Sequence, residues 1–473
     1  MGIDVKTALN LKRYFLNYPK FLSYWMASPK SLLRIYREKL TYLALKKISE
    51  GKIIFPFLYI TYQKRSKKHL VGGLHQYNYF TTPSKSLFYL GSGSVLRALW
   101  VIFFKKQVSA THIAKIMHPQ STSLFNSKLE KFQQTHGNHK IGSFKLLSLL
   151  PATWARNLDD YGFPHAYHFL QSAKRANVSI FDFPTKAISA NPISQTSTDK
   201  KREWELIEEL IIKTSSKILV ISGHKRSFDS FNLEILLRLK DKYSLTVLLL
   251  MLDDWSTDYL NVVQSWGGVI DKVLVYEVEN TITKEFDPSK VLVWPFPRLA
   301  KLSNPSKSYK KSFDAIKFVG SPYLNRIPWL FFISMICRKN PGLKLEFDSA
   351  AKIGKHKKSV GDYLELYSQG EVTLHFLERT PNVYSFTSSV WDAFAGGALV
   401  IAQVGVNHDP ISDFFRPGID YLPFTSLSEL LVILETLQSH PNLIEDIAIS
   451  GLDFMKQNYS ASKLFNYLFN HIA

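Results

Sequence analysis

A chain of 473 residues with 45% hydrophobic residues is long enough for two or three domains, each with its own core. Its single cysteine, Cys337, excludes a fold held by internal disulfides and fits a reducing compartment. The start, MGIDVKTALNLKRYF, is interrupted by charges too early for a secretory signal peptide, so we expect a cytoplasmic protein.

The net charge of +20 belongs almost entirely to the first third of the chain. Residues 1–142 hold 23 Lys and Arg against four acidic residues, whereas the remainder holds 36 basic against 35 acidic residues. A region with this excess attracts phosphates or anionic lipid headgroups. We therefore treat residues 1–142 as a region with its own binding properties.

Residues 1–142 are predicted to be mainly helical and rich in aromatic residues. Apolar side chains recur every three or four residues in ALNLKRYFLNYPKFLSYW and SLLRIYREKLTYLALKKI, with Lys and Arg between them. This pattern fits either a peripheral position at the inner face of a membrane or a helical domain packed on the rest of the protein. Arg97 interrupts the most apolar stretch, 86–104, which favours a buried or interfacial helix over a transmembrane span.

Predicted strands and helices alternate through residues 143–300. The apolar strands are FKLLSLLP, NVSIFDFP, KILVISG, LTVLLLMLDD, KVLVYEV and KVLVWPF, and amphipathic helices are predicted between the first four of them. Alternation of this kind with all-apolar strands predicts a parallel sheet that helices cover on both faces. We expect an N-terminal Rossmann-like domain here.

A basic linker at 299–312 precedes a second series of the same kind over residues 313–473. Strands are predicted at IKFVGS, LKLEFDS, VTLHFLE and ALVIAQV, and three amphipathic helices close the chain. Two such α/β domains in tandem direct their strand carboxyl ends into a common cleft, where a ligand belongs. The expected fold is therefore two Rossmann-like domains that face each other across a cleft.

One short helix in the second series begins with three hydroxyl residues. Thr387, Ser388 and Ser389 stand directly before VWDAFA, and two glycines follow it. The N–H groups and dipole of a helix start favour phosphate, although the same residues also serve as a plain helix cap. Asp392 lies one turn further, on the face of Ser388, where its carboxylate can accept hydrogen bonds from a sugar.

Three segments of the second series occur in an order known from one family. FVGSPYLNRIPWL, SSVWDAFAGGALVIA and DFFRPGIDYLPF resemble the donor-binding domain of group-1-like glycosyltransferases with the GT-B fold, among them the CgeB-type spore-maturation enzymes. The resemblance covers about residues 144–473 and leaves residues 1–142 outside it. Ser389 stands where this branch usually has Arg, and Asp392 stands where it has Glu.

The resemblance implies a site for a nucleotide-sugar donor in the second domain. Thr387, Ser388 and Ser389 would bind the diphosphate, with Gly320 and Arg326 beside it, and Asp392 would bind the ribose. For Arg326 the alternative is a solvated surface residue, and for Asp392 it is a capping carboxylate. The two departures weaken a claim to catalysis more than a claim to donor binding.

Transfer to an acceptor hydroxyl often uses a base at the cleft. The candidates are Asp159, Asp160, His165 and Glu378, each in or after the loop that follows a predicted strand. His165 has local packing at a helix start as its alternative role. Asp253 and Asp254 lack a third acidic ligand nearby, so we expect no metal site.

We therefore expect a metal-independent glycosyltransferase that uses a nucleotide sugar as its substrate and needs no other cofactor. The acceptor would be a polysaccharide, a glycolipid or a cell-envelope precursor, and residues 1–142 would hold the enzyme at an anionic membrane surface. The alternative is a catalytically degenerate GT-B-like protein whose basic third binds a polyanion, either nucleic acid or an anionic membrane. Nucleic acid is the less favoured partner, because residues 1–142 contain no recognised nucleic-acid motif.

Overall fold

The computed structural model describes residues 144–161, 163–186, 196–223, 231–251, 257–277, 285–296, 313–320, 342–348, 359–368, 372–380, 383–405 and 408–472, with single residues such as Arg298 and Arg326 between them. The predictions for residues 1–142, for the basic linker and for the acidic pair Asp253 and Asp254 lie outside the described residues.

The chain divides into two compact units. The larger contains Trp100–Val319 and Lys358–Ala473, and the smaller contains Met1–Leu99 and Gly320–Lys357. Strand β8 (Lys344–Asp348) belongs to the smaller unit. The other described strands and all of the helices named below belong to the larger one.

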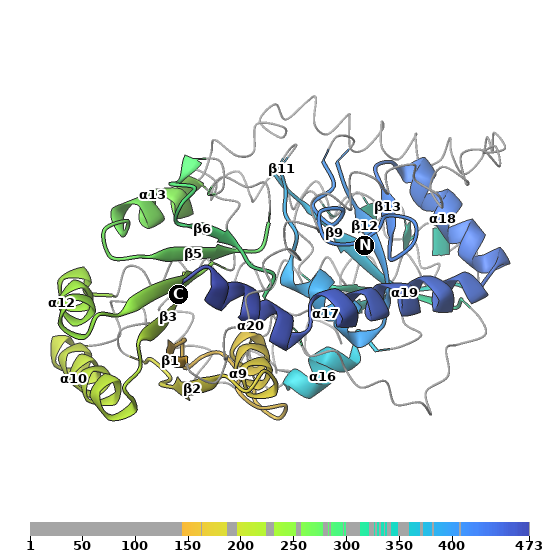
Figure 1. The fold of residues 1–473 in the computed structure, drawn as a ribbon. Coiled ribbons are helices and arrows are strands. Elements are labelled where there is room, and N and C mark those ends of the chain that lie inside the picture. The colour runs from red at the N-terminus through yellow and green to blue at the C-terminus, as the bar shows by residue number, and fades with distance from the viewer. Residues whose placement is uncertain are drawn as a thin grey trace, which may run out of the picture. The chain divides into compact units, whose positions relative to one another are not determined.

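The first sheet has six strands in the order β2-β1-β3-β4-β5-β6, and every neighbouring pair is parallel (Figure 1). Its strands are β1 (Lys145–Leu149), β2 (Ser179–Asp182), β3 (Ile218–Ser222), β4 (Thr246–Leu250), β5 (Lys272–Val275) and β6 (Val291–Val293). The helices between them are α9 (His165–Arg175), α10 (Ser197–Thr214), α12 (Leu233–Tyr243) and α13 (Thr257–Ser265). All five residues of β3 are buried, as expected for a strand covered on both faces.

Helix α10 begins four residues before the predicted start, because the polar segment ahead of it supplies a complete cap. The side chain of Thr196 accepts a hydrogen bond from the backbone N–H of Asp199, and the carboxylate of Asp199 accepts one from the backbone N–H of Thr196. This capping box satisfies two N–H groups that would otherwise lack partners. The bounds of helix α13 were not predicted from the sequence.

The second sheet follows the order β13-β12-β9-β7 within the larger unit. Its strands are β7 (Ala315–Val319), β9 (Val372–Phe376), β12 (Leu399–Gln403) and β13 (Leu422–Phe424), and all of these pairs are parallel. The other elements are α16 (Val360–Glu365), the hairpin β10 (Glu378–Thr380) and β11 (Val383–Tyr384), α17 (Ser388–Gly396), α18 (Leu427–Ser439), α19 (Asn442–Asn458) and α20 (Ala461–Asn470). The predicted α/β class with two parallel sheets is confirmed. The hairpin and β13 were not predicted, since strands of two or three residues carry too little periodicity.

Helix α17 starts and stops where the sequence places it. Gly397 takes the left-handed conformation with φ 77°, which a glycine adopts at little cost, and ends the helix. A Cβ on Gly396 would lie 1.9 Å from the backbone oxygen of Tyr367, so α17 packs directly on the chain that leaves α16.

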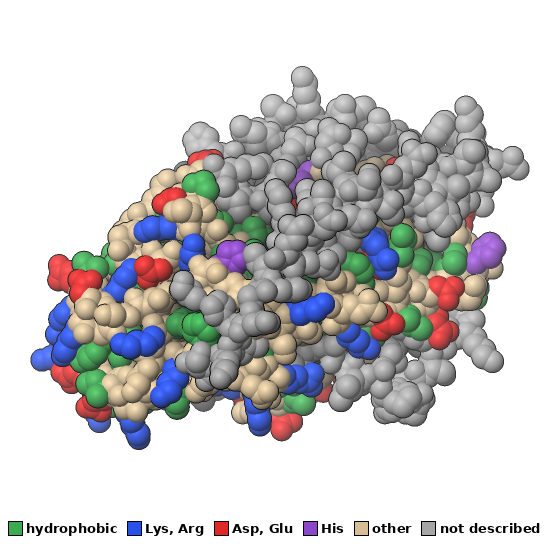
Figure 2. Space-filling view, in the orientation of Figure 1, with side chains coloured by type: hydrophobic (Ala, Val, Ile, Leu, Met, Phe, Trp, Pro, Cys, Tyr) green, Lys and Arg blue, Asp and Glu red, His purple; other side chains and the backbone are tan. Residues whose placement is uncertain are grey.

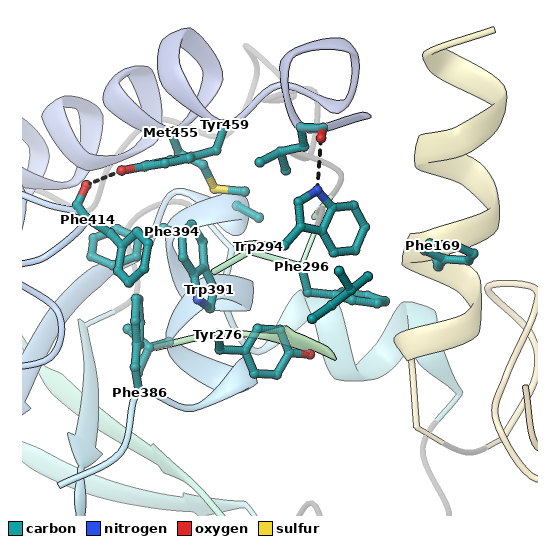
Figure 3. Packing of buried hydrophobic residues seen from close by; sticks show 14 of the residues in the cluster. Phe169, Tyr276, Trp294, Phe296, Phe386, Trp391, Phe394, Phe414, Met455 and Tyr459 are labelled. Carbon is teal, nitrogen blue, oxygen red and sulfur yellow. Dashed lines mark hydrogen bonds between the residues drawn. The ribbon is translucent and has the colours of Figure 1, made fainter. Parts of the chain in front are cut away.

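One aromatic core joins the two sheets of the larger unit (Figure 3). Trp294, just after β6, donates a hydrogen bond from Nε1 to the backbone oxygen of Leu464 in α20 at 2.8 Å. The ring of Phe465 in α20 lies 5.9 Å from that of Phe169 in α9 and 5.7 Å from that of Trp294. The last helix of the chain therefore packs on the first sheet's side of the core, beside α9 (Figure 1).

The outer face of the first sheet carries charges of both signs. Figure 2 shows Lys and Arg mixed with Asp and Glu over α10 and α12. Glu208 accepts hydrogen bonds there from Arg238 at 3.1 Å, from Lys242 at 2.8 Å and from the hydroxyl of Tyr243 at 2.8 Å. Within the described ranges, none of the helices has the length and apolar character needed to cross a membrane.

Candidate functional site

The start of α17 offers backbone donors at the carboxyl edge of the second sheet. Thr387 has extended backbone angles (φ −87°, ψ 153°), and its hydroxyl exchanges a 2.8 Å hydrogen bond with that of Ser389 instead of capping the helix. Among the described residues, the backbone N–H groups of Thr387, Ser388 and Ser389 have no acceptor. Such a helix start attracts anions through its donors and its dipole.

The segment before α17 is held from both sheets. The backbone N–H of Ser385 donates to the carbonyl of Leu377, directly after β9, at 3.0 Å. The backbone N–H of Phe386 donates to Oε1 of Glu277, a residue only 1% exposed, two positions after β5. Glu277 was not singled out from the sequence, although its place after an apolar strand puts it at a sheet's carboxyl edge.

One turn into α17, Asp392 lies in the interior with no exposed side-chain surface. Its Oδ1 accepts a hydrogen bond from Nε of Arg298 at 2.7 Å and lies 3.3 Å from Nε2 of His168. Its Oδ2 accepts a hydrogen bond from the hydroxyl of Tyr363 at 2.9 Å. Both carboxylate oxygens are thus engaged by side chains from α9, from the segment after β6 and from α16.

Burial and the neighbouring charges shift the pKa values of this group in opposite directions. Burial alone would raise the pKa of Asp392, but the charge of Arg298 and the contact with His168 outweigh it and hold that pKa well below its usual range. Burial lowers the pKa of His168, and the neighbouring carboxylate of Asp392 offsets only part of this lowering. Asp392 and Arg298 therefore form a buried ion pair, and burial favours the neutral form of His168 beside it.

A second polar group follows β9 and β12. Glu378 accepts a long 3.4 Å hydrogen bond from Nε2 of Gln403, the last residue of β12. Tyr384 stands opposite Glu378 in the hairpin, and burial together with this carboxylate raises the pKa of its hydroxyl. The ring of Tyr384 meets that of His408 edge-on at 6.3 Å. Gln403 and His408 were not singled out from the sequence; Gln403 ends β12, and His408 lies five residues later.

The loop after β1 contains the two predicted acidic bases. Asp160 accepts backbone hydrogen bonds from Arg156 at 2.8 Å and from Asn157 at 2.9 Å, and these bonds lower its pKa. Asp160 therefore closes the loop on itself. Asp159 is exposed. The backbone oxygen of Asp160 also accepts a hydrogen bond from Val360 at the start of α16, at 2.9 Å.

His165 begins α9 and is only 8% exposed. Its ring meets those of Trp154 at 5.2 Å and Phe296 at 6.0 Å edge-on, and it stacks on Phe163 at 5.9 Å. The structure thus places His165 among aromatic rings.

The remaining predicted donor residues lie in the smaller unit. Gly320 directly follows β7 and has a φ of 156°, and Arg326 is buried at 7% exposure. Their expected contact with the diphosphate stays a prediction. In the described part of the chain, no three His, Cys, Asp or Glu side chains are grouped so that they could hold a metal ion.

A family model described as glycosyl transferase-like matches residues 330–470, which include the start of α17. Similar solved structures include HepE from Anabaena in complex with UDP and glucose (TM-score 0.43, 10% identity, 70% of this chain and 99% of that chain) and a glycosyltransferase from Rickettsia africae (TM-score 0.41, 12% identity, 69% and 97%). A DNA-modifying beta-glucosyltransferase is also similar (TM-score 0.42, 14% identity, 69% and 98%). No curated protein sequence matches the chain. The expected resemblance to glycosyltransferases is confirmed over residues 330–470.

Proposed function

We propose that this protein is a glycosyltransferase that moves a sugar from a nucleotide-sugar donor to a saccharide, glycolipid or cell-envelope acceptor. The observation that carries the proposal is that the glycosyl transferase-like region contains the start of α17, with three backbone N–H groups that have no acceptor among the described residues. Within this family the CgeB-type branch is the subtype that the sequence favours.

The transfer breaks the bond between the sugar's anomeric carbon and the diphosphate oxygen, and it forms a bond to the acceptor oxygen. Negative charge develops on the leaving diphosphate. In our proposal the N–H groups of Thr387, Ser388 and Ser389 stabilise this charge, since fixed donors aimed at developing charge accelerate such steps. They take the part that a cation would otherwise play, so activity should persist in excess EDTA.

For the base that accepts the acceptor's proton we favour Asp159 and Glu378. Asp160 holds its own loop through backbone hydrogen bonds, and His165 is packed among rings. Asp159 is exposed, and Glu378 follows β9 at the carboxyl edge of the second sheet, where it accepts the 3.4 Å hydrogen bond from Gln403. Replacing the true base by its amide should lower kcat about 100-fold or more while nucleotide binding is unchanged.

The donor site can be tested by removing a single backbone donor. Ser388 is the first residue of α17, where proline fits a helix, and the extended backbone of Thr387 suits a residue before proline. Ser388→Pro should therefore keep the helix and remove one N–H, weakening UDP binding about tenfold. Ser388→Ala is the matched control, because it removes the hydroxyl and keeps the N–H.

The measurement is isothermal calorimetry, after a thermal-shift screen with UDP, GDP and ADP has shown which nucleotide stabilises the protein. If no nucleotide at millimolar concentration stabilises folded protein, the proposed function is wrong. If the proline and alanine variants bind equally well, the backbone of α17 is not the diphosphate site.

We further propose that residues 1–142 hold the enzyme at an anionic membrane surface near its acceptor. Their 23 Lys and Arg against four acidic residues support this proposal. The full chain should float with vesicles that contain anionic lipid and remain behind with neutral vesicles. Binding to a polyanion without any nucleotide binding would favour the degenerate binding protein instead.

A further inference from the structure

We infer that Asp392 is a positioning residue, which fixes the start of α17 through Arg298, His168 and Tyr363 and does not itself contact the donor. We call these four residues the junction lock. The inference rests on the proposed function, because it concerns the same diphosphate site.

The junction lock joins segments that are distant in the sequence. His168 comes from α9 beside the first sheet, Arg298 follows β6, and Tyr363 comes from α16. All three converge on the carboxylate of Asp392, with contacts of 3.3 Å from His168, 2.7 Å from Arg298 and 2.9 Å from Tyr363. Because the side chains of Asp392 and Arg298 have no exposed surface, a ribose would have to displace this group to reach the carboxylate.

A second attachment lies on the other side of the donor residues. Glu277 holds the backbone N–H of Phe386, and the junction lock holds Asp392, so Thr387, Ser388 and Ser389 lie between two points that are tied to the first sheet. A site binds more tightly when its donors are already held in the bound geometry. The junction lock thus keeps the three N–H groups in place before the diphosphate arrives.

Charge and positioning make different predictions for this group. Asp392 and Arg298 are oppositely charged and buried together. If only charge mattered, loss of Asp392 would strengthen the binding of an anion nearby, and loss of Arg298 would weaken it. If positioning matters, loss of either partner weakens binding. A direct ribose contact predicts a third result, in which only loss of Asp392 weakens binding, and only for ligands that contain the ribose.

The test is calorimetric binding of UDP and of inorganic pyrophosphate to the full chain and to three variants. Asp392→Asn and Arg298→Gln should each weaken both ligands about tenfold, because misplaced donors lose much of their effect. Tyr363→Phe removes only one hydroxyl and should weaken both about threefold. Since the first two changes leave a buried charge without its partner, Tyr363→Phe decides the test if neither of them folds.

Asp420→Asn is the matched control. Asp420 has no exposed side-chain surface and bonds with Arg416 at 2.8 Å and Ser450 at 2.8 Å, outside the junction lock. This variant should lose stability and keep both affinities. If Asp420→Asn also weakens the binding of both ligands, the effect of the other variants comes from a general loss of stability. That result would overturn the inference.

Other results contradict the inference just as clearly. Weaker UDP binding in Asp392→Asn with normal pyrophosphate binding would mean a direct ribose contact. Opposite changes in Asp392→Asn and Arg298→Gln would mean a pure charge effect, and unchanged affinities in all variants would exclude any role in binding. A wild-type chain that binds neither UDP nor pyrophosphate contradicts the proposed function as well, whereas the other outcomes leave that function standing.

Discussion

Two carboxylates in this protein have almost the same partners and opposite surroundings. Asp392 is surrounded by Arg298, Tyr363 and His168 between the two sheets, and Glu208 is surrounded by Arg238, Lys242 and Tyr243 on the outer face of α10 and α12. The side chains of Asp392 and Arg298 are 0% exposed, whereas those of Arg238 and Lys242 are 62% and 58% exposed. The difference is access to water, and it decides what the same chemical groups do.

At Glu208, hydrogen bonds from Lys242 and Tyr243 lower the pKa of the carboxylate, and burial opposes them little. Water competes for every partner there, so each contact can be lost and replaced. At Asp392 the charged partners must overcome a large cost of burial, and removing one of them leaves a charge that water cannot reach. The outer group therefore adds little to the fold, while the inner group fixes one arrangement.

The largest expected difference comes from removing the arginine in each group. Arg298→Met leaves Asp392 buried without its main counter-charge and should cost about 3–5 kcal/mol of unfolding free energy. Arg238→Met on the outer face should cost about 0.5 kcal/mol or less. Urea unfolding of both variants measures the contrast. Equal losses would mean that the two groups do not differ as the burial of their side chains indicates.

Two glycine replacements compare the packing of α17, which carries Asp392, with that of a turn beside the first sheet. A Cβ on Gly396 would meet the backbone of Tyr367, whereas a Cβ on Gly268, in the turn after α13, would meet nothing within 4 Å. Gly396→Ala should therefore lower the unfolding free energy by about 3 kcal/mol through overpacking. Gly268→Ala should change it by about 0.5 kcal/mol or less. A tolerant Gly396 would show that α17 can shift away from α16.

The sequence predicts most of the strands and the ends of α17, but it does not predict the partners of Asp392. Runs such as KILVISG and LTVLLLMLDD identify buried parallel strands, and hydroxyl residues followed by a glycine pair give the two ends of α17. The partners of Asp392 could not be predicted, since Arg298 is 94 residues away and Tyr363 is 29 residues away. Helical spacing suggested a carboxylate beside the donor, and only the tertiary packing shows which side chains surround it.

A third comparison is the pH dependence of the stability that two carboxylates near the second sheet, Asp409 and Asp392, contribute. Asp409, after β12, accepts hydrogen bonds from Tyr421 at 2.5 Å and from the backbone of Ile411 at 3.0 Å, yet burial raises its pKa to about 6. Because the pKa of Asp409 is higher in the folded than in the unfolded protein, its contribution to the free energy of unfolding is fully present below about pH 4. That contribution is lost as the pH rises through about 6. The pKa of Asp392 is shifted in the opposite direction, so its contribution to the free energy of unfolding is lost only in acid.

Asp409→Asn should therefore raise the unfolding free energy at pH 8 by about 2 kcal/mol at most, because part of the residue contacts water. At pH 5 the gain should be much smaller, since Asp409 is then largely protonated. Asp392→Asn should destabilise the protein at both pH values. Thermal melts at pH 5 and pH 8 provide the measurement, and a gain for Asp409→Asn that is equal at both would contradict the raised pKa.

The smallest effect separates the two groups most cleanly, because it removes one hydroxyl from each. Tyr363 donates to Asp392 at 2.9 Å and Tyr243 donates to Glu208 at 2.8 Å, so the two bonds match in chemistry and length. Tyr363→Phe should cost about 1.5 kcal/mol, as for a buried bond to a charged group, and Tyr243→Phe about 0.5 kcal/mol. Combining Tyr363→Phe with Arg298→Met should cost less than the sum of the single changes, because both act on one carboxylate. Strict additivity there would mean that Tyr363 and Arg298 do not act through Asp392 together.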